Sequence, residues 1–307
     1  MKIVFMGTPK FAVPSLKILV DNNYIIPFVV TVPDKEKGRG LKKQFSDVKL
    51  FALENNLPVL QPEKLKNPEF LKTLHDANPD LIVIIAFRML PKEVYAFPRL
   101  GSVNVHASYL PEYRGAAPIN RAIINGEKET GLTTFFLEDK ADTGNIILQQ
   151  KVEILEKDNA GTLHDKLSVL GAELLLKSLK LIETGKYELK VQDDSLATKA
   201  PKIFKEDCLI DWKKPSEVIH NQIRGLSPYP AAFTHMNGKV LKIFKSCNTV
   251  LKSSLEPGKI LIDGKKLFVN TGDNLLELLE IQLEGKKRIP SGEFLNGIDK
   301  NLLTMFE

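Results

Sequence analysis

The sequence is poor in the residues that build disulfide frameworks and zinc sites. Its 307 residues include two cysteines and five histidines. Cys208 and Cys247 alone supply neither a four-ligand zinc site nor the framework of a small secreted domain. Four histidines lack partners at metal-ligand spacing and are interpreted as structural or surface residues, so no metal is expected: His75, His164, His220 and His235.

Long apolar runs and a secretory signal are also missing. No run reaches the ~20 apolar residues of a membrane-spanning helix. Met1 and Lys2 lead directly into the short run IVFM rather than into a signal sequence. Hydrophobic residues make up 43% and charged residues 26%, as in soluble globular proteins. We therefore expect a cytoplasmic protein of one large or two ordinary domains, with no membrane partner.

The GxGxxG fingerprint of dinucleotide-binding sites is absent. The chain nevertheless opens with a buried strand over 2–6, a turn at Gly7-Thr8-Pro9 and an amphipathic helix over 11–20. The β-branched run at 81–87 is typical of a central parallel strand that is buried on both faces. These elements favour a Rossmann-like, mostly parallel sheet with helices on both faces.

Basic residues are in modest excess, with a formal net charge of +5. This charge fits a nucleic-acid partner, although many proteins without one are equally basic. The segment 33–44, PDKEKGRGLKKQ, concentrates basic residues between glycines and is expected to be a flexible, exposed loop. Such a loop can contact phosphates, and an ordinary solvated loop is the alternative.

The last third of the chain has the pattern of an antiparallel β domain. The polar segment 185–202 marks a linker before it. Asn237-Gly238 lies between two alternating runs and is a strong hairpin signal. Short strands are expected at 258–262, 266–270 and 275–282.

Two lysine-rich clusters lie in this predicted β domain. Lys239, Lys242 and Lys245 alternate with apolar residues and are expected to share one strand face toward solvent. Lys286, Lys287 and Arg288 form the second cluster. Both clusters suit phosphate contact in a basic groove, and ordinary solvated faces remain the alternative.

The stretch 101–118, GSVNVHASYLPEYRGAAP, carries the clearest chemical signal. Asn104 and His106 are two residues apart on a predicted strand, so they point to the same face. An irregular loop follows, which is where open α/β sheets place their sites. Asp142 lies in a second loop, KADTGN. The three groups suit general acid–base chemistry with charge stabilisation, although each alone could be a hydrogen-bonded structural group.

The run NVHASYLPEYRGAAPI, followed by ADTGNII, resembles the signature of the 10-formyltetrahydrofolate-dependent formyltransferases. The resemblance extends over essentially the whole chain, and RGAAPI is closest to the members that act on charged initiator tRNA. It implies transfer of the formyl group of 10-formyltetrahydrofolate to the free α-amino group of initiator methionyl-tRNA, for translation initiation. It also implies that no metal is needed and that the protein is a monomer.

The resemblance assigns catalytic roles to three residues. Asn104 would donate a hydrogen bond to the oxyanion, and Asp142 would orient the imidazole of His106. His106 would either take a proton from the attacking ammonium or stabilise the intermediate, and the sequence leaves these two roles open.

The resemblance also assigns binding residues. The folate pocket would be formed by Phe87, Arg88, Met89, Leu90, Ser108, Leu110 and Pro111. The mouth of the acceptor site would be formed by Gly7, Thr8 and Arg114, with a tight strand–helix connection as the alternative for the first two. The tRNA would be contacted by Arg39, which matches an important arginine of the family, and by Lys35, Lys37, Lys42, Lys43, Lys239, Lys242, Lys245, Lys286, Lys287 and Arg288.

The implied domain organisation has three parts. Residues 1–188 would form the catalytic domain, 189–206 the linker and 207–307 an OB-like antiparallel β-barrel that holds the tRNA. Rival interpretations are a formyltransferase acting on a small amine (a nucleotide precursor or an amino-sugar nucleotide) and a folate hydrolase. A nucleic-acid-binding module on a catalytically silent scaffold is a further rival, against which the intact Asn104, His106 and Asp142 argue.

Overall fold

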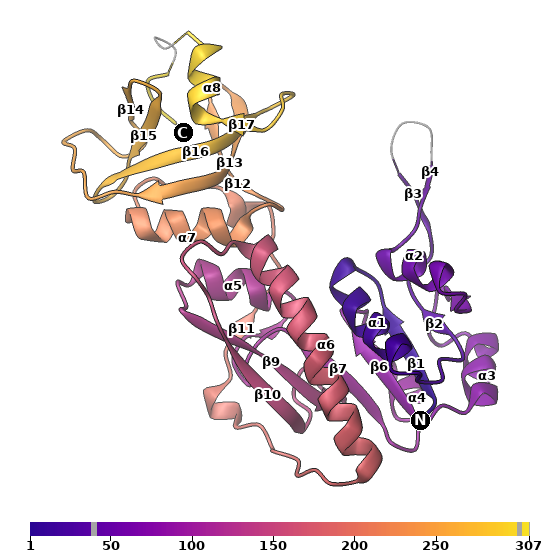
Figure 1. Ribbon diagram of the computed structural model, residues 1–307. Coiled ribbons are helices and arrows are strands. Elements are labelled where there is room, and N and C mark those ends of the chain that lie inside the picture. The colour runs from indigo at the N-terminus through magenta and orange to yellow at the C-terminus, as the bar shows by residue number, and fades with distance from the viewer. Residues whose placement is uncertain (38–41, 300–302, 307) are drawn as a thin grey trace. The chain divides into compact units, whose positions relative to one another are not determined.

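The computed structural model describes residues 1–37, 42–299 and 303–306 and divides into two compact units (Figure 1). The first unit contains residues 1–115, 130–152 and 164–199. The second contains residues 116–129, 153–163 and 200–307. Neither unit is one continuous stretch, because the chain passes between them several times. Among the described residues, no helix has the length and apolar character needed to span a membrane.

A seven-stranded sheet in the order β10-β9-β7-β6-β1-β2-β5 forms the centre of the first unit. The pairs β1–β2, β2–β5, β1–β6 and β6–β7 are parallel, whereas β7 and β9 are antiparallel. The strands are β1 (Ile3–Gly7), β2 (Val29–Val30), β5 (Val59–Leu60), β6 (Leu81–Ile85), β7 (Ser102–His106), β9 (Glu129–Phe136) and β10 (Ile146–Glu153). The predicted mostly parallel sheet is confirmed.

Helices and short segments connect these strands. They are η1 (Lys10–Ala12), α1 (Val13–Asp21), α2 (Asp47–Glu54), α3 (Pro68–Ala77), α4 (Lys92–Tyr95), α6 (Ala160–Thr184), η2 (Asp194–Leu196), β8 (Arg114–Gly115) and β11 (Lys199–Ala200). The Ser46 hydroxyl caps α2 by accepting a hydrogen bond from the Lys49 amide at 3.1 Å. Asn67 caps α3 in the same way, through the Glu69 amide.

Both faces of the central strands are covered. Every residue of β1 and β6 is buried, as in parallel sheets with helices on both sides. Val4 and Met6 pack in one cluster with Phe70 of α3. Their neighbour Phe5, which points to the other face, is also fully buried. The continuous apolar runs of the sequence therefore correspond to strands buried on both faces.

Gly171 brings α6 close to the strand that carries Asn104 and His106. A Cβ at Gly171 would lie 3.2 Å from Val105 and 3.4 Å from Leu132, so only glycine allows this approach without adjustment. Val105 points to the face opposite Asn104 and His106. Because α6 covers the Val105 face, the two polar side chains face away from this helix.

The segment 33–44 differs from the expected irregular loop. Residues 35–37 form β3 (Lys35–Lys37), which pairs with β4 (Lys42–Gln44) as an antiparallel hairpin. The loop prediction is wrong for these residues, because pairing across a short connection satisfies backbone groups that charged composition does not reveal. Arg39 lies outside the described residues.

The second unit contains an antiparallel sheet in the order β12-β13-β16-β15-β14, with β17 paired to β16. Asn237 and Gly238 have positive φ angles of 51° and 73° and join β12 to β13, which confirms the predicted hairpin. The elements of this unit are α5 (Pro118–Ile124), η3 (Glu206–Cys208), α7 (Ser216–Leu226), β12 (Ala232–Met236), β13 (Lys239–Asn248), β14 (Ile260–Asp263), β15 (Lys266–Asn270), β16 (Leu275–Leu283), β17 (Ile289–Pro290) and α8 (Ser291–Asn296).

The lysines of β13 do not share one face, which corrects the sequence-based expectation. Residues three apart in a regular strand point to opposite faces. Lys239 alternates with the buried Leu241 and belongs to that face. A register shift between Ile243 and Lys245 adds one residue to β13 relative to β16. Lys242 and Lys245 therefore pair with residues two apart in β16, and both lie on the other face.

Candidate active site

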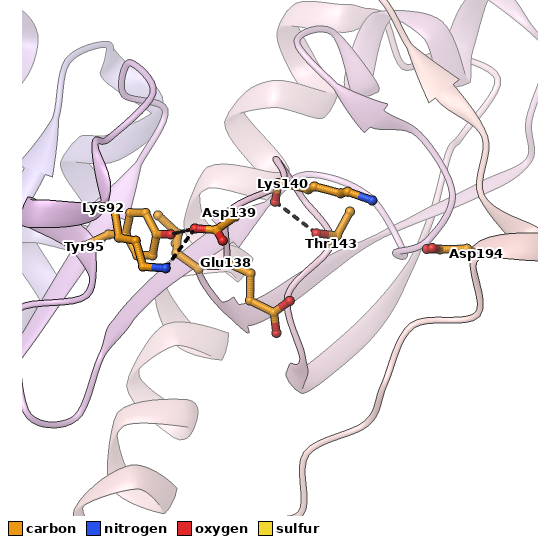
Figure 2. Close-up of a pocket in the computed structure, with 8 residues that line it drawn as sticks. Lys92, Tyr95, Glu138, Asp139, Lys140, Thr143 and Asp194 are labelled. Carbon is orange, nitrogen blue, oxygen red and sulfur yellow. Dashed lines mark hydrogen bonds and ion pairs between the residues drawn. The ribbon is translucent and has the colours of Figure 1, made fainter.

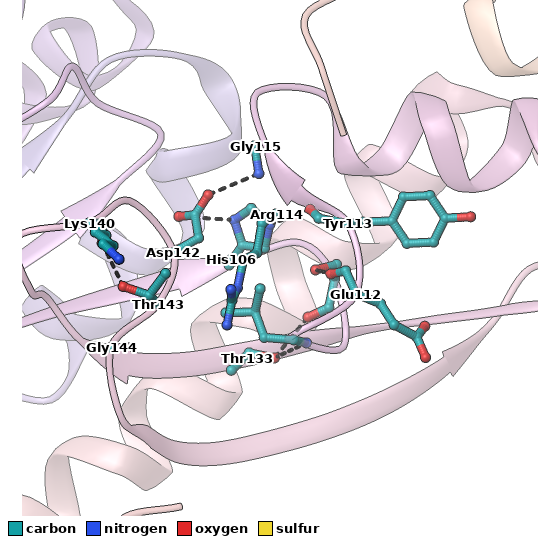
Figure 3. Close-up of polar contacts among 12 residues, drawn as sticks. His106, Glu112, Tyr113, Arg114, Gly115, Thr133, Lys140, Asp142, Thr143 and Gly144 are labelled. Carbon is teal, nitrogen blue, oxygen red and sulfur yellow. Dashed lines mark hydrogen bonds and ion pairs between the residues drawn. The ribbon is translucent and has the colours of Figure 1, made fainter. Parts of the chain in front are cut away.

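The imidazole of His106 is held by one hydrogen bond and lies beside a carboxylate. Its Nε2 lies 2.9 Å from the carbonyl oxygen of Tyr113 (Figure 3). Because a carbonyl can only accept, Nε2 carries the hydrogen of this bond, and Nδ1 of the neutral ring carries the lone pair. Nδ1 faces Asp142, whose Oδ1 is 3.7 Å away. The side chain of His106 is 8% exposed, so this pair lies in a largely water-excluded position.

Asp142 is held in an unusual backbone conformation. Its φ is +58°, in the left-handed region that non-glycine residues rarely adopt. The Oδ2 atom accepts a hydrogen bond from the Gly115 amide at 3.0 Å, which orients the other oxygen toward His106. At Gly144 a Cβ would lie 1.7 Å from the carbonyl oxygen of Phe136, so this tight loop requires glycine. The loop that follows the end of β9 thus holds Asp142 in this position.

Asn104 is half-buried on the same strand as His106 and points to the same face. It pairs in register with Ile84 on one side and Phe135 on the other. No hydrogen bond of its side-chain amide is found among the described residues. Its two N–H donors are therefore available to a bound molecule.

The turn after β7 is closed by hydrogen bonds that sequence reasoning missed. The Thr133 hydroxyl donates to the Ser108 carbonyl at 2.8 Å and accepts from the Leu110 amide at 3.0 Å. Gln149 donates to the Leu110 carbonyl at 2.7 Å. Ser108 and Leu110 are 0% and 1% exposed, so neither side chain offers a surface to a ligand in this structure. Pro111 is half-buried in the same turn.

The strand exit at 87–90 presents one exposed apolar side chain. Phe87 and Leu90 pack against the core of the sheet, whereas Met89 is 72% exposed. The Arg88 guanidinium donates to the carbonyl oxygens of Pro62 and Glu63. Arg88 therefore ties two backbone segments together and does not point a free cation outward.

A cavity of about 550 Å³ lies beside the Asp142 loop. It is lined by Lys92, Tyr95, Leu137, Glu138, Asp139, Lys140, Thr143 and Asp194 (Figure 2). The Tyr95 hydroxyl donates to Asp139, and together with the nearby Lys92 ammonium it lowers the pKa of the Asp139 carboxyl. The volume is typical of a small-molecule pocket. None of the residues predicted for folate lines it, although four of them, Phe87, Arg88, Met89 and Leu90, lie just before Lys92 in the sequence.

Comparison with known proteins identifies the family of this chain. Residues 1–179 match the formyl transferase family, and residues 202–299 match the formyl transferase C-terminal domain. The chain belongs to the formyl transferase family. A methionyl-tRNA formyltransferase from Caldanaerobacter subterraneus subsp. tengcongensis is 50% identical over 299 residues, which cover 97% of each chain.

Two solved structures share the fold of this formyl transferase at lower identity. The sugar 3N-formyl transferase WlaRD, in the presence of dTDP and 5-N-formyl-THF, is 24% identical with a TM-score of 0.67. The match covers 94% of this chain and 99% of WlaRD. HypX from Aquifex aeolicus, in complex with tetrahydrofolic acid, is 17% identical with a TM-score of 0.66. That match covers 96% of this chain and 47% of HypX.

The residues named for the acceptor side of this formyl transferase have different environments. A Cβ at Gly7 would lie 2.8 Å from Phe5 and 2.9 Å from Ala12, so tight packing alone explains glycine there. The Thr8 hydroxyl is buried without a hydrogen bond among the described residues. The Arg114 guanidinium is held by other side chains of the same unit and is 16% exposed.

The basic residues named for tRNA contact also differ in their surroundings. Lys286 and Lys287 are exposed. Arg288 is paired with Glu280, and its guanidinium lies 4.2 Å from the centre of the Phe244 ring. The remaining lysines belong to strands β3, β4 and β13: Lys35, Lys37, Lys42, Lys43, Lys239, Lys242 and Lys245.

Proposed function

We propose that this formyl transferase moves the formyl group of 10-formyltetrahydrofolate to the α-amino group of initiator methionyl-tRNA. The observation that carries this proposal is the 50% identity to a methionyl-tRNA formyltransferase over 97% of both chains. The sugar 3N-formyl transferase has the same fold at only 24% identity. The arrangement of Asn104, His106 and Asp142 supports the chemistry, because it joins a free amide donor to a paired imidazole.

His106 accepts the proton that the attacking amine must lose. The Tyr113 carbonyl holds Nε2–H, so the lone pair of the neutral ring is on Nδ1. A proton at Nδ1 is stabilised by the Asp142 carboxylate 3.7 Å away, in surroundings with little water. This geometry favours a general base over a purely electrostatic role for His106. It also gives Asp142 the task of stabilising the imidazolium.

Asn104 stabilises the negative charge that develops during transfer. The amine nitrogen forms a bond to the formyl carbon, and the carbonyl electrons move onto oxygen. An amide N–H aimed at such an oxyanion contributes about 3 kcal/mol of barrier lowering. The intermediate then collapses: the bond between the formyl carbon and N10 breaks, and N10 takes up a proton. The products are formylmethionyl-tRNA and tetrahydrofolate.

The donor folate binds beside the Asp142 loop. The cavity there has room for a heteroaromatic ring, and Tyr95 and Leu137 give it apolar wall. The strand exit contributes Met89 as an exposed apolar contact, with Phe87 and Leu90 behind it. An indirect role in folate binding is assigned to four residues that fix the position of the backbone: Arg88, Ser108, Leu110 and Pro111. Folate is a co-substrate here, and no metal is assigned a role.

The tRNA is bound by basic residues of both units. Residues 1–188 serve as the catalytic domain, 189–206 as the linker and 207–307 as the tRNA-binding domain, whose antiparallel sheet is an OB-like barrel. Arg39 and the lysines of β3 and β4 contact the acceptor end of the tRNA, and Gly7, Thr8 and Arg114 line the acceptor site. Lys242, Lys245, Lys286 and Lys287 supply non-specific phosphate contacts. The protein acts as a monomer in the cytoplasm, where charged tRNA is used.

A transfer assay with radiolabelled formyl donor tests this function. Charged initiator tRNA, charged elongator tRNA, free methionine and a dTDP-amino sugar are offered in parallel. Label on initiator methionyl-tRNA alone is the expected result. Label on the amino sugar would overturn the proposal in favour of a sugar enzyme, and formate released without any acceptor would indicate a hydrolase.

A further inference from the structure

The side chain of Gln192 joins the Asp142 loop to Arg114. Its Nε2 donates to the carbonyl oxygens of Asp142 at 3.0 Å and Gly144 at 2.8 Å. Its Oε1 accepts from Arg114, from Nε at 3.1 Å and from Nη2 at 2.7 Å. Gln192 lies 50 residues after Asp142 and 78 after Arg114, in the segment that the sequence presents as a polar linker.

Every hydrogen-bonding position of this amide is used. An amide has two N–H donors and one oxygen with two lone pairs, and each finds a partner here. Gln192 is 8% exposed, so water cannot readily replace a lost bond. The two carbonyls accept only and the guanidinium donates only, which fixes the orientation of the amide. Among uncharged side chains, only the carboxamides of glutamine and asparagine offer two donors and an acceptor at one point.

Thr198, further along the same segment, holds the other side of the site. Its hydroxyl accepts from the Tyr113 amide at 2.8 Å, and its carbonyl accepts from the Arg114 amide at 2.9 Å. Tyr113 supplies the carbonyl that binds Nε2 of His106. The segment therefore supports the group that orients His106 and the loop that presents Asp142.

We propose that Gln192 is a positioning residue for the His106–Asp142 pair. Asp142 keeps its left-handed backbone because Gln192 bonds the carbonyls on both sides of Thr143. The segment 192–198 is accordingly part of the catalytic framework and not a passive connection. This inference rests on the proposed function, because the pair is assigned its chemical role there.

Two substitutions separate the two halves of the Gln192 contact. Gln192→Leu removes both the donors and the acceptor. Gln192→Glu keeps an oxygen for Arg114 but places a carboxylate against two carbonyls to which it cannot donate. If the contact with the Asp142 loop matters, both variants lose activity to a similar extent.

Gln222 provides a matched control in the second unit. Its Nε2 also donates to two backbone carbonyls, those of Asp207 at 2.9 Å and Leu209 at 3.0 Å. Gln222→Leu therefore removes the same kind of contact from a place without catalytic groups. Thermal unfolding of all variants reports the structural cost of each change.

The measurements are kcat, the KM for each substrate and the pH dependence of kcat, with 10-formyltetrahydrofolate and initiator methionyl-tRNA. We expect kcat to fall about 10- to 100-fold in both Gln192 variants, with each KM within about threefold of the wild type, because small misplacements of catalytic groups are costly. The pH dependence of kcat should also change, because Gln192 orients the groups that are assigned the proton transfer. Gln222→Leu should leave kcat and the profile unchanged.

Three outcomes would overturn the inference. They are near-normal kcat in Gln192→Glu, an equal loss in Gln222→Leu, and a lower kcat with an unchanged pH dependence. Thr198→Val and Thr198→Ser provide a second test if a Gln192 variant does not fold. The serine variant keeps the hydroxyl and should restore most of the activity that valine loses.

Failure of the proposed function would look different. In that case the wild type itself would not label initiator methionyl-tRNA, and the same variants would be assayed with whichever acceptor the wild type labels. Equal activity of wild type and Gln192→Leu on that acceptor would then reject the positioning role separately.

Discussion

Two largely buried histidines in different units contrast in what surrounds them. His106 lies in the first unit with its Nε2 on a carbonyl and its Nδ1 facing a carboxylate 3.7 Å away. His220 lies in the second unit on α7, with Nδ1 2.9 Å from the Ser246 hydroxyl. Burial, followed by the charge of Arg224, lowers the pKa of His220 to about 4.

The contrast shows how the protein separates chemistry from stability. A carboxylate beside an imidazole lets the ring carry a proton in a buried place, which acid–base catalysis requires. An arginine beside an imidazole keeps the ring neutral, which suits a packing and hydrogen-bonding role. The two histidines therefore differ in the groups beside the ring: a carboxylate next to His106, and a serine hydroxyl and an arginine next to His220.

The largest expected effect comes from removing the groups on the catalytic face of β7. Asn104→Ala should lower kcat about 100- to 1000-fold, equivalent to about 3 to 4 kcal/mol, because the oxyanion loses its donor. His106→Asn should lower kcat by at least a hundredfold through loss of the base. Steady-state kinetics at pH 8 measure both, with tRNA affinity as a check on folding.

The matched control for these variants is His220→Gln. It should keep kcat within about twofold at pH 8, because His220 lies in the second unit and takes no part in the proposed chemistry. Near-normal turnover in Asn104→Ala and His106→Asn would reject the catalytic assignment of β7.

The second effect is a loss of folding stability at acid pH that is caused by His220. The unfolded residue titrates near 6.5 and the folded residue near 4. Its contribution to stability is therefore complete above pH 6.5 and is lost as pH falls toward 4, because only the unfolded chain takes up the proton. The loss amounts to about 3 kcal/mol at pH 4.

Urea unfolding of wild type and His220→Gln from pH 4 to 8 measures this term. The difference in unfolding free energy between the two proteins should shrink as the pH falls through this window. Carboxylates that titrate in the same range cancel in the difference. A pH-independent difference would contradict the assignment of His220 as a neutral buried group.

A smaller effect is expected from Asp142→Asn. The amide can still accept from Gly115 but no longer neutralises a proton on His106, so kcat should fall about 30-fold, or about 2 kcal/mol. Asp165→Asn is the control, since its carboxylate pairs with Lys10 and His164 on the surface. Equal kcat in Asp142→Asn and wild type would show that the carboxylate does not assist the imidazole.

The smallest effect concerns the basic face of the antiparallel sheet. Lys242→Gln with Lys245→Gln should weaken tRNA binding about fivefold, about 1 kcal/mol, and lower the salt slope by about 2. Saturating kcat should be unchanged. Filter binding at several salt concentrations measures this effect.

The control for the lysine pair is Lys252→Gln with Lys265→Gln, which removes the same charge from other exposed positions. Equal losses in the two double variants would mean that net charge, and not the β13 face, attracts the tRNA.

Local patterns in the sequence were sufficient for much of the fold. The apolar runs predicted β1 and β6, and Asn237-Gly238 predicted the hairpin of the second unit, because these signals depend on neighbouring residues only. The period of two placed Asn104 and His106 on one face for the same reason. Where the period was broken, at the bulge in β13, the predicted face was wrong.

Tertiary structure decided which polar groups surround those side chains. No sequence pattern joins Gln192 to Asp142, since the two residues are 50 positions apart and their contact leaves no local periodicity. Tyr113 likewise acts through its backbone carbonyl, and Thr133 through its hydroxyl. Sequence patterns predict only that these residues lie in a turn and in a strand. Hydrogen bonds depend on position within about 3 Å and on direction, and only the folded chain sets both. The sequence alone determined which chemical groups this protein possesses, and the fold determined which of them meet.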